Sequence, residues 1–338
     1  MDRRFVLGTD EREKFRALMR VYERFTGCRV TAYCLMENHF HLLLEVPPMK
    51  SGGLEDEELL KRLSAIYSES FVAGVAAELV DARRQVAEGV ADEEVVVKRI
   101  HDRFVYRMHD LSEFMKGLLQ RYTQWHNRKN SRCGRLWEDR FKSVIVEDGV
   151  AARTIAAYID LNPVRAGVVN DPAEYRWSSY GEAIGGGARS NGRTARAGLV
   201  RAWGANEGWE ADPGLWSARV ANRYRKLLMA GAVEKTREAG VRNGQVALKV
   251  VRKGISKEEA EQGGGSSGEV PFATMLRCRI RYFTDGAVIG SRSFVDEVFT
   301  RSRGRFGSRR KNGARRLRGN ASAASGVLWS IRDLKVRI

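Results

Sequence analysis

The sequence has few cysteines and no long apolar run. Its four cysteines, Cys28, Cys34, Cys133 and Cys278, are scattered and form no CxxC pair, so we expect reduced thiols rather than a disulfide framework or a zinc site. No run reaches the roughly 18 apolar residues that cross a bilayer, and the N-terminal MDRRFVLG lacks an apolar signal core. These absences predict a cytoplasmic protein that does not contact membranes.

Positive charge is in excess and lies mainly near the C-terminal end. The 338 residues carry 59 Lys and Arg against 42 Asp and Glu, a formal net charge of +17. Residues 269–338 alone hold 16 basic and five acidic side chains, a net +11. We expect this end to bind a polyanion, most often nucleic acid in the cytoplasm, with a solvated tail as the alternative.

Changes in composition divide the chain. An acidic run stands at residues 55–58, and GGGSSG at residues 263–268 has the composition of a flexible linker. Leu59, Leu63 and Ile66 have helical spacing, so the segment around them is expected to be a helical insertion. The predicted parts are a domain at 1–180 with an insertion at about 49–107, a variable helical or linker region at 181–268, and a basic, mostly helical DNA-binding extension at 269–338.

Hydrophobic periodicity predicts a mixed α+β domain. Apolar residues recur at helical spacing in some segments, and β-rich runs flank a turn at residues 37–38. The predicted helices are 10–25, ended by Gly27, then 111–125, and 150–161, stopped by Asn162 and Pro163. The predicted strands are 30–36, 39–46 and 136–146.

Two of the five histidines stand two residues apart in the run NHFHLLLE at residues 38–45. Side chains alternate faces along a strand, so His39 and His41 share one face while Phe40, Leu42 and Leu44 point into a core. Two neighbouring neutral imidazoles are suited to one divalent metal, with positions left for oxygen ligands. The alternative is a pair of ordinary histidines on a half-exposed strand.

The helix at 111–127 carries a second group of polar residues. Tyr122 and His126 lie on one helix face because they are four residues apart, and Asn127 is one step round. A tyrosine hydroxyl is a phosphoryl-transfer nucleophile when a cation polarises the phosphate. Tyr122 also continues the apolar stripe of this helix, so a core tyrosine is the alternative.

The segment TAYCLMENHFHLLL at residues 31–44 resembles the HUH motif of single-tyrosine insertion-sequence transposases. Three further strings follow in the order seen in REP-associated tyrosine transposases, together with RWSSY at 176–180. They are RYTQWHNR at 121–128, GRLWEDRFK at 134–142 and YIDLNPVRAG at 158–167. The resemblance covers residues 2–47 and 109–180, about the size of one domain.

The resemblance implies a fold, a ferredoxin-like antiparallel sheet backed by helices. It also implies an activity, the nicking of single-stranded DNA. In such enzymes two histidines and a polar residue hold Mg²⁺ or Mn²⁺ on the scissile phosphate, and the tyrosine forms a 5′-phosphotyrosine. Carried over, His39 and His41 are metal ligands, Tyr122 is the nucleophile, and Asn127 is the third ligand with His126 as its rival. Family members usually carry an apolar residue at the position of His126. They also begin with a further strand, which we expect to be missing here.

Several basic residues are candidate DNA contacts. Arg121 flanks the tyrosine, Arg140 and Lys142 share one face of the predicted strand, and Arg165 follows Asn162 and Pro163. For Arg140 and Lys142, an ordinary solvated surface is as good an interpretation as a DNA contact. For Arg165, the alternative is that it caps a helix end. The C-terminal candidates are Arg303, Arg309, Arg310, Lys311, Arg315 and Arg316. We expect Trp125, Trp137 and Trp177 to be core residues rather than base-stacking platforms.

The function predicted from these residues is metal-dependent DNA nicking and strand transfer, that is, DNA transposition by a monomer or homodimer without a small-molecule cofactor. The alternative is an inactive or domesticated DNA-hairpin-binding protein derived from such an enzyme. A helix-turn-helix built from residues 275–283 and a helix from Ser291 through Arg301 fits that alternative. A third class, a metallohydrolase of small molecules, is less well supported, because the sequence has no further acidic or histidine ligand motifs. That function would also leave the basic C-terminal end unexplained.

Overall fold

The computed structural model describes residues 7–138, 140–185, 190–204, 216–242, 245–262, 287–309, 311, 313–316 and 328–331. The chain forms two compact units, one of Met1–Val30 with Leu44–Arg140 and the other of Thr31–Leu43 with Phe141–Ile338. The described residues are mostly helical with small sheets, so the predicted α+β class is confirmed. None of the described helices is long and apolar enough to span a membrane.

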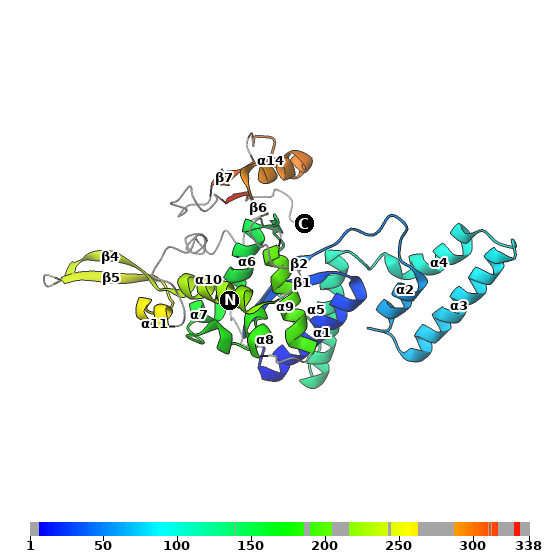
Figure 1. Ribbon diagram of the computed structural model, residues 1–338, viewed down its shortest axis with the longest axis horizontal. Helices are drawn as coiled ribbons and strands as arrows, with labels where there is room; N and C mark the ends of the chain where they lie inside the picture. Colours follow the sequence, from blue (N-terminus) through cyan, green and yellow to red (C-terminus); the bar gives the residue numbers. More distant parts are fainter. Residues whose placement is uncertain are drawn as a thin grey trace. The chain divides into compact units, whose positions relative to one another are not determined.

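The first unit is helical (Figure 1). Its helices are α1 (Thr9–Thr26), α2 (Asp56–Leu63), α3 (Glu69–Ala87), α4 (Glu93–Val105) and α5 (Leu111–Lys129). Helix α1 packs against α5, and α3 packs against α4. The helices predicted at 10–25 and 111–125 are therefore confirmed, and α5 continues one turn beyond the prediction.

The contact between α1 and α5 follows from their apolar stripes. The buried residues of α1 include Phe15, Met19 and Tyr22, at helical spacing. On α5, Gly117 allows a close approach, because a Cβ there would lie 2.3 Å from the Tyr22 ring. Gly27 ends α1 with a φ of 74°, a left-handed conformation that glycine adopts without strain.

Helices α2 to α4 occupy the segment predicted as a helical insertion, and they are tied to the end of α1. The Arg62 guanidinium lies 2.9 Å from the His109 ring, whose Nδ1 lies 2.8 Å from the carbonyl of Pro47. Tyr67 meets Phe25 edge-on at 6.5 Å between ring centroids. These contacts hold both ends of the insertion on the helical body of the first unit.

The described residues of the second unit form most of a β-hairpin, several helices and two further small sheets. The hairpin is β1 (Arg29–Leu35) and β2 (Phe40–Glu45), as predicted from the two β-rich runs. The helices of this unit are α6 (Val150–Asp160), α7 (Asn162–Ala166), α8 (Ser179–Gly185), α9 (Ser190–Gly204), α10 (Ala218–Ala232), α11 (Lys257–Gln262) and α14 (Arg292–Arg301). Strands β3 (Ile145–Val146), β6 (Val288–Gly290), β8 (Trp329–Ile331) and β7 (Arg315–Arg316) form one sheet in that order, and β4 (Lys235–Arg242) pairs with β5 (Gln245–Arg252).

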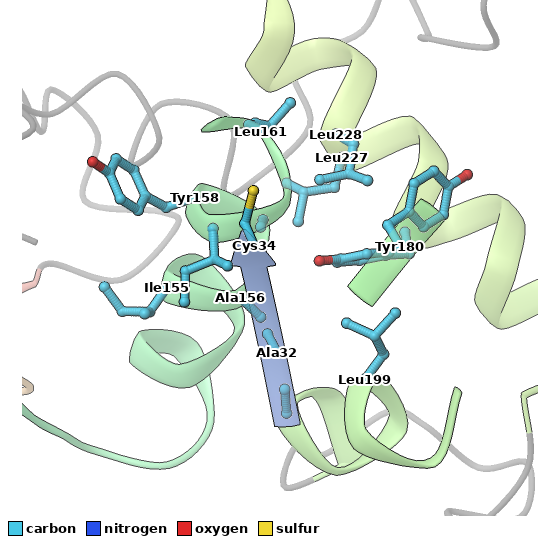
Figure 2. Close-up of a cluster of buried hydrophobic side chains, with 14 of the residues drawn as sticks. Ala32, Cys34, Ile155, Ala156, Tyr158, Leu161, Tyr180, Leu199, Leu227 and Leu228 are labelled. Carbon is cyan, nitrogen blue, oxygen red and sulfur yellow. The ribbon is translucent and has the colours of Figure 1, made fainter. Parts of the chain in front are cut away.

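The core of the second unit forms around β1 (Figure 2). Ala32 and Cys34 extend from this strand among apolar side chains of the surrounding helices. The neighbours drawn in Figure 2 include Ile155, Ala156 and Tyr158 of α6, Leu161 between α6 and α7, Tyr180 of α8, Leu199 of α9, and Leu227 and Leu228 of α10. Burial of this strand on its α6 side fixes the position of the hairpin within the unit.

The C-terminal segment completes this unit. Ile289 of β6 and Leu328 are buried in the same core cluster as Ala32. Strand β6 pairs in parallel with β3, and Ser291 caps α14 by accepting a hydrogen bond from the Phe294 amide, as predicted. The basic end is thus built into the fold over its described residues. The other predicted helix of the helix-turn-helix, 275–283, lies outside the described residues.

Two predictions of secondary structure need correction. The predicted strand 136–146 is wrong, because among its described residues only Ile145 and Val146 are in a strand. The region expected to be helical or linker, 181–268, contains the two-stranded ribbon of β4 and β5 in addition to helices. Arg140 and Lys142 therefore do not share a strand face.

Candidate functional site

The histidine pair lies at the turn end of the hairpin, in the second unit. The Met36 amide donates a hydrogen bond to the His39 carbonyl at 2.9 Å, which closes the turn between β1 and β2. The rings of His39 and His41 are 5.1 Å apart between centroids, at an interplanar angle of 82°. The predicted juxtaposition of the two imidazoles is therefore present. Phe40, Leu42 and Leu44, predicted to be core residues, are only half-buried.

Asn38 positions the ring of His39. Its Oδ1 lies 2.6 Å from Nδ1 of His39. Because an amide oxygen only accepts hydrogen bonds, this contact assigns the proton to Nδ1 and leaves the lone pair on Nε2. A side-chain partner of this kind fixes the tautomer of metal-binding histidines. In this tautomer the exposed His39 ring would coordinate a metal through its Nε2 atom.

His41 is half-buried and its ring stays neutral. Burial, and then the neighbouring His39, lower the pKa of His41 to about 4. The His41 ring meets the buried ring of Tyr158 on α6 at 6.0 Å between centroids. The Arg165 guanidinium lies 4.8 Å from the Tyr158 ring centroid. A neutral imidazole is the form that binds metal, so His41 is available as a ligand at neutral pH.

The chemistry of these donors suits a divalent cation. Two neutral imidazoles bind Mn²⁺ and leave positions for phosphate oxygens. No group of three or more His, Cys, Asp or Glu suited to a metal occurs within the described ranges.

Tyr122 lies in the first unit, inside the apolar stripe of α5. Its side chain is fully buried, and its ring packs edge-on against Phe15, at 5.2 Å between centroids, and at a tilt against Trp137, at 5.7 Å. The hydroxyl has no hydrogen-bond partner among the described residues. Burial, and then the charge of Glu11, raise the pKa of this hydroxyl above its ordinary value. In this arrangement Tyr122 is a protonated and unsatisfied buried phenol.

The rivals for the third ligand differ in their surroundings. The His126 ring is buried 6.1 Å from the Tyr122 ring, and its Nδ1 has no hydrogen-bond partner in the described part of the chain. Burial, and then Arg132, lower the pKa of His126. Asn127 donates from Nδ2 to the carbonyl of Gly134 at 2.9 Å, which directs its Oδ1 away from that turn. Both residues belong to the first unit with Tyr122, whereas the histidine pair belongs to the second.

The predicted DNA contacts separate into exposed and internally used residues. Arg165 is half-buried beside Tyr158, and Arg303 donates to the carbonyls of Gly307 and Ser308 at 3.2 and 3.0 Å. Arg303 therefore stabilises its own turn. Arg310 lies outside the described residues. The exposed candidates are Arg121, Arg140, Lys142, Arg309, Lys311, Arg315 and Arg316.

Trp125, Trp137 and Trp177, the tryptophans predicted to be core residues, are half-buried. Trp137 donates from Nε1 to the hydroxyl of Thr123 at 3.0 Å, and Trp177 packs against the core of the second unit. Trp125 lies between Lys14 and Lys129, whose ammonium groups are 5.9 and 5.3 Å from its ring centroid. The core interpretation therefore fits Trp137 and Trp177 better than Trp125.

Sequence reasoning missed two residues beside the histidines. Asn38 orients His39, and its position directly before the pair was the available signal. Tyr158 contacts His41, and it begins the YIDLNPVRAG string that carries the family resemblance. The contact joins residues 117 positions apart in sequence, so spacing alone does not reveal it.

Comparison with known proteins supports part of the resemblance. Residues 1–70 match the family model described as "Transposase IS200 like". No curated protein matches the chain, and no solved structure does. The matched segment includes α1, the hairpin and its histidine pair, so the similarity to IS200-like transposases covers these elements.

Proposed function

We propose that this protein is a single-tyrosine DNA strand transferase of the REP-associated kind. It nicks single-stranded DNA in a metal-dependent reaction and joins strands through a 5′-phosphotyrosine. We assign the hairpin, α1 and α5 to a ferredoxin-like HUH domain that carries this chemistry. The observation on which the proposal rests is the pair of adjacent imidazoles in a segment that matches IS200-like transposases.

The two imidazoles are suited to their role by their protonation. His41 is neutral at neutral pH, and the contact with Asn38 Oδ1 places the proton of the His39 ring on Nδ1. His39 and His41 would hold Mg²⁺ or Mn²⁺, with Asn127 or His126 as the proposed third ligand. The cation would polarise the scissile phosphate and neutralise its charge. The role of the histidines is therefore to bind the cation that carries the phosphate.

The proposed chemical step belongs to Tyr122. The Tyr122 phenol gives up its proton as Oη attacks phosphorus, the bond between phosphorus and the 3′ oxygen breaks, and the leaving oxygen takes up a proton as a 3′-hydroxyl, so no proton is gained or lost overall. Attack of a 3′-hydroxyl on the phosphotyrosine reverses the step and joins strands. Because the Tyr122 hydroxyl is buried beside Phe15 and Trp137, this end of α5 has to move before the hydroxyl meets DNA.

A second candidate function follows from the same burial. If α5 keeps Tyr122 buried, the chain binds DNA hairpins without cutting them, as a protein derived from a transposase. The raised pKa of the Tyr122 hydroxyl favours this alternative, because a protonated phenol is a poor nucleophile. The two candidates differ only in whether a covalent adduct forms.

The deciding experiment is incubation with single-stranded hairpin DNA and Mn²⁺, followed by denaturing electrophoresis. The wild type should give a covalent protein–DNA adduct, and Tyr122→Phe should reduce it by at least about 10³-fold, since the nucleophile is removed. Tyr106→Phe, which changes an exposed tyrosine of the same unit, is the matched control. An adduct of equal yield from Tyr122→Phe would refute the assignment. No adduct from the wild type would favour the hairpin-binding alternative.

A further inference from the structure

The β4–β5 ribbon is an element that the proposed chemistry does not use. Figure 1 shows the two strands side by side, extending beyond α10 and α11. Its base is held by the core of the second unit: Ala232 and Ile255 are buried, and the Ile255 amide donates to the Ala232 carbonyl at 3.1 Å. A Cβ at Gly254 would lie 2.0 Å from that same carbonyl, so the backbones meet closely at the base.

The register of the ribbon sorts its residues onto two faces. Opposed residues in an antiparallel pair lie on the same face, and successive pairs alternate between faces. Each of the two irregularities adds one residue to one strand and leaves the alternation of pairs intact. One face takes the pairs Lys235↔Arg252, Arg237↔Lys249, Gly240↔Ala247 and Arg242↔Gln245, and the other takes Thr236↔Val250, Glu238↔Leu248 and Val241↔Val246.

The first of these faces, which we call the basic face, carries five cationic residues and no acidic one. Two of its pairs place positive residues directly opposite each other, Lys235 with Arg252 and Arg237 with Lys249. Like charges in directly opposed positions destabilise a sheet, and an isolated two-stranded ribbon is marginal to begin with. The pattern is unfavourable for the ribbon alone and becomes favourable when a polyanion neutralises it.

On the other face, one pair has side chains whose exposure is described, and no other part of the described chain covers that pair. Thr236 and Val250 oppose each other there, and both are exposed, Val250 to 46%. Eight residues in each strand give a ribbon about 26 Å long at roughly 3.3 Å per residue. The major groove of duplex DNA, about 12 Å wide, admits a two-stranded ribbon of this kind.

We propose that the basic face of the β4–β5 ribbon binds duplex DNA, in the stem of a hairpin, through phosphate contacts at the major groove. This inference rests on the proposed function and extends it, because it assigns the paired part of the substrate to an element distinct from the histidines and Tyr122. The ribbon positions the stem, and cleavage takes place on the unpaired strand.

The test measures binding rather than cleavage, so its failure is distinct from failure of the proposed function. The binding of a labelled DNA hairpin is titrated at several NaCl concentrations, using full-length protein with Tyr122→Phe to exclude nicking. The ribbon variant Arg237→Thr with Lys249→Thr removes one opposed cationic pair. A second variant, Lys235→Thr with Arg252→Thr, removes the other pair and serves if the first does not fold.

The matched control is Lys61→Ala with Lys98→Ala, which removes the same charge from exposed side chains of α2 and α4. Each ribbon variant should weaken hairpin binding at least tenfold near 0.1 M salt. It should also lower the slope of log K against log salt by about 2, because each phosphate contact contributes roughly 0.9. The control should leave this slope unchanged.

Three results would overturn the inference. They are an unchanged slope in a folded ribbon variant, an equal loss in the control, and an equal loss of binding to an unpaired oligonucleotide of the same length. Binding of anionic lipid vesicles that falls in parallel with hairpin binding would show a general polyanion surface and would also count against a duplex site. A loss confined to the hairpin stem would support it.

Discussion

Helices α5 and α6 each contain a fully buried polar group, the Tyr122 hydroxyl and the Asp160 carboxylate, and the surroundings of these two groups differ in opposite ways. The Asp160 carboxylate on α6 accepts hydrogen bonds from Ser179 Oγ at 2.8 Å, from the Tyr180 amide at 3.0 Å and from the Tyr224 hydroxyl at 2.5 Å. The Tyr122 hydroxyl on α5 is equally inaccessible and has no partner among the described residues. One group is fully satisfied and the other is not.

The difference separates a structural polar group from a candidate functional one. A buried polar group that is well bonded joins the elements that supply its partners, here α6, α8 and α10. A buried group left without a partner costs stability, and such exceptions in a folded protein call for an explanation. We explain the cost at Tyr122 by its proposed role as the nucleophile.

Replacing Asp160 should have the largest effect on stability. Asp160→Ala leaves the Ser179 hydroxyl, the Tyr180 amide and the Tyr224 hydroxyl without their acceptor in a dry core. We expect a loss of at least about 3 kcal/mol in the free energy of unfolding. Denaturant unfolding measures it, with Asp148→Ala at an exposed position as the control. A loss below about 1 kcal/mol would mean that this network does not hold the second unit together.

The same carboxylate should make stability depend on pH. Burial raises the pKa of Asp160 from 3.8 to about 6, against the opposing effect of its hydrogen bonds. The folded state therefore keeps the proton over a range in which the unfolded chain has lost it. The free energy of unfolding should fall by about 3 kcal/mol as the pH rises from about 4 to about 6, and this contribution should then stay constant.

Thermal unfolding of the wild type and of Asp160→Asn across this pH range isolates that contribution. The variant should lack the decline because an amide does not titrate. Parallel pH profiles of the two proteins would contradict the assignment of the slope to Asp160.

Two tyrosine hydroxyls allow a matched comparison, in which we expect smaller changes in the free energy of unfolding than for Asp160→Ala. Tyr224→Phe removes a donor to the buried Asp160 carboxylate and should cost about 1–3 kcal/mol. Tyr122→Phe removes a hydroxyl without a partner and should change the free energy of unfolding by less than about 0.5 kcal/mol, or increase it. Denaturant unfolding of both variants tests the contrast. A loss at Tyr122 as large as that at Tyr224 would show that the Tyr122 hydroxyl is satisfied in solution.

The last prediction concerns metal affinity and the orientation of His39. Asn38→Ala removes the contact that fixes its tautomer, and Mn²⁺ affinity should fall about tenfold. His39→Ala and His41→Ala should weaken Mn²⁺ binding further. Calorimetric titration of Mn²⁺ measures all three, with Glu37→Ala on the same turn as the control. Equal Mn²⁺ affinity in all of these proteins would show that the histidines are structural.

The elements that sequence predicted well are those set by local periodicity. The apolar stripe of α1 with Gly27 at its end, and the cap of α14 at Ser291, each depend on residues a few positions apart. The predicted strand 136–146 failed for the opposite reason. Its Trp137 donates to Thr123 of α5, and among its described residues only Ile145 and Val146 pair with another strand, β6, more than 140 residues away.

The candidate site divides in the same way. The juxtaposition of His39 and His41 could be predicted from the local sequence, because alternation along a strand is a property of the backbone. Three features depend on tertiary packing: Tyr122 is buried without a hydrogen-bond partner among the described residues, Tyr158 contacts His41, and Asp160 accepts hydrogen bonds from two other helices. Burial and hydrogen-bond partners depend on which distant segments pack together, and no local pattern encodes that choice.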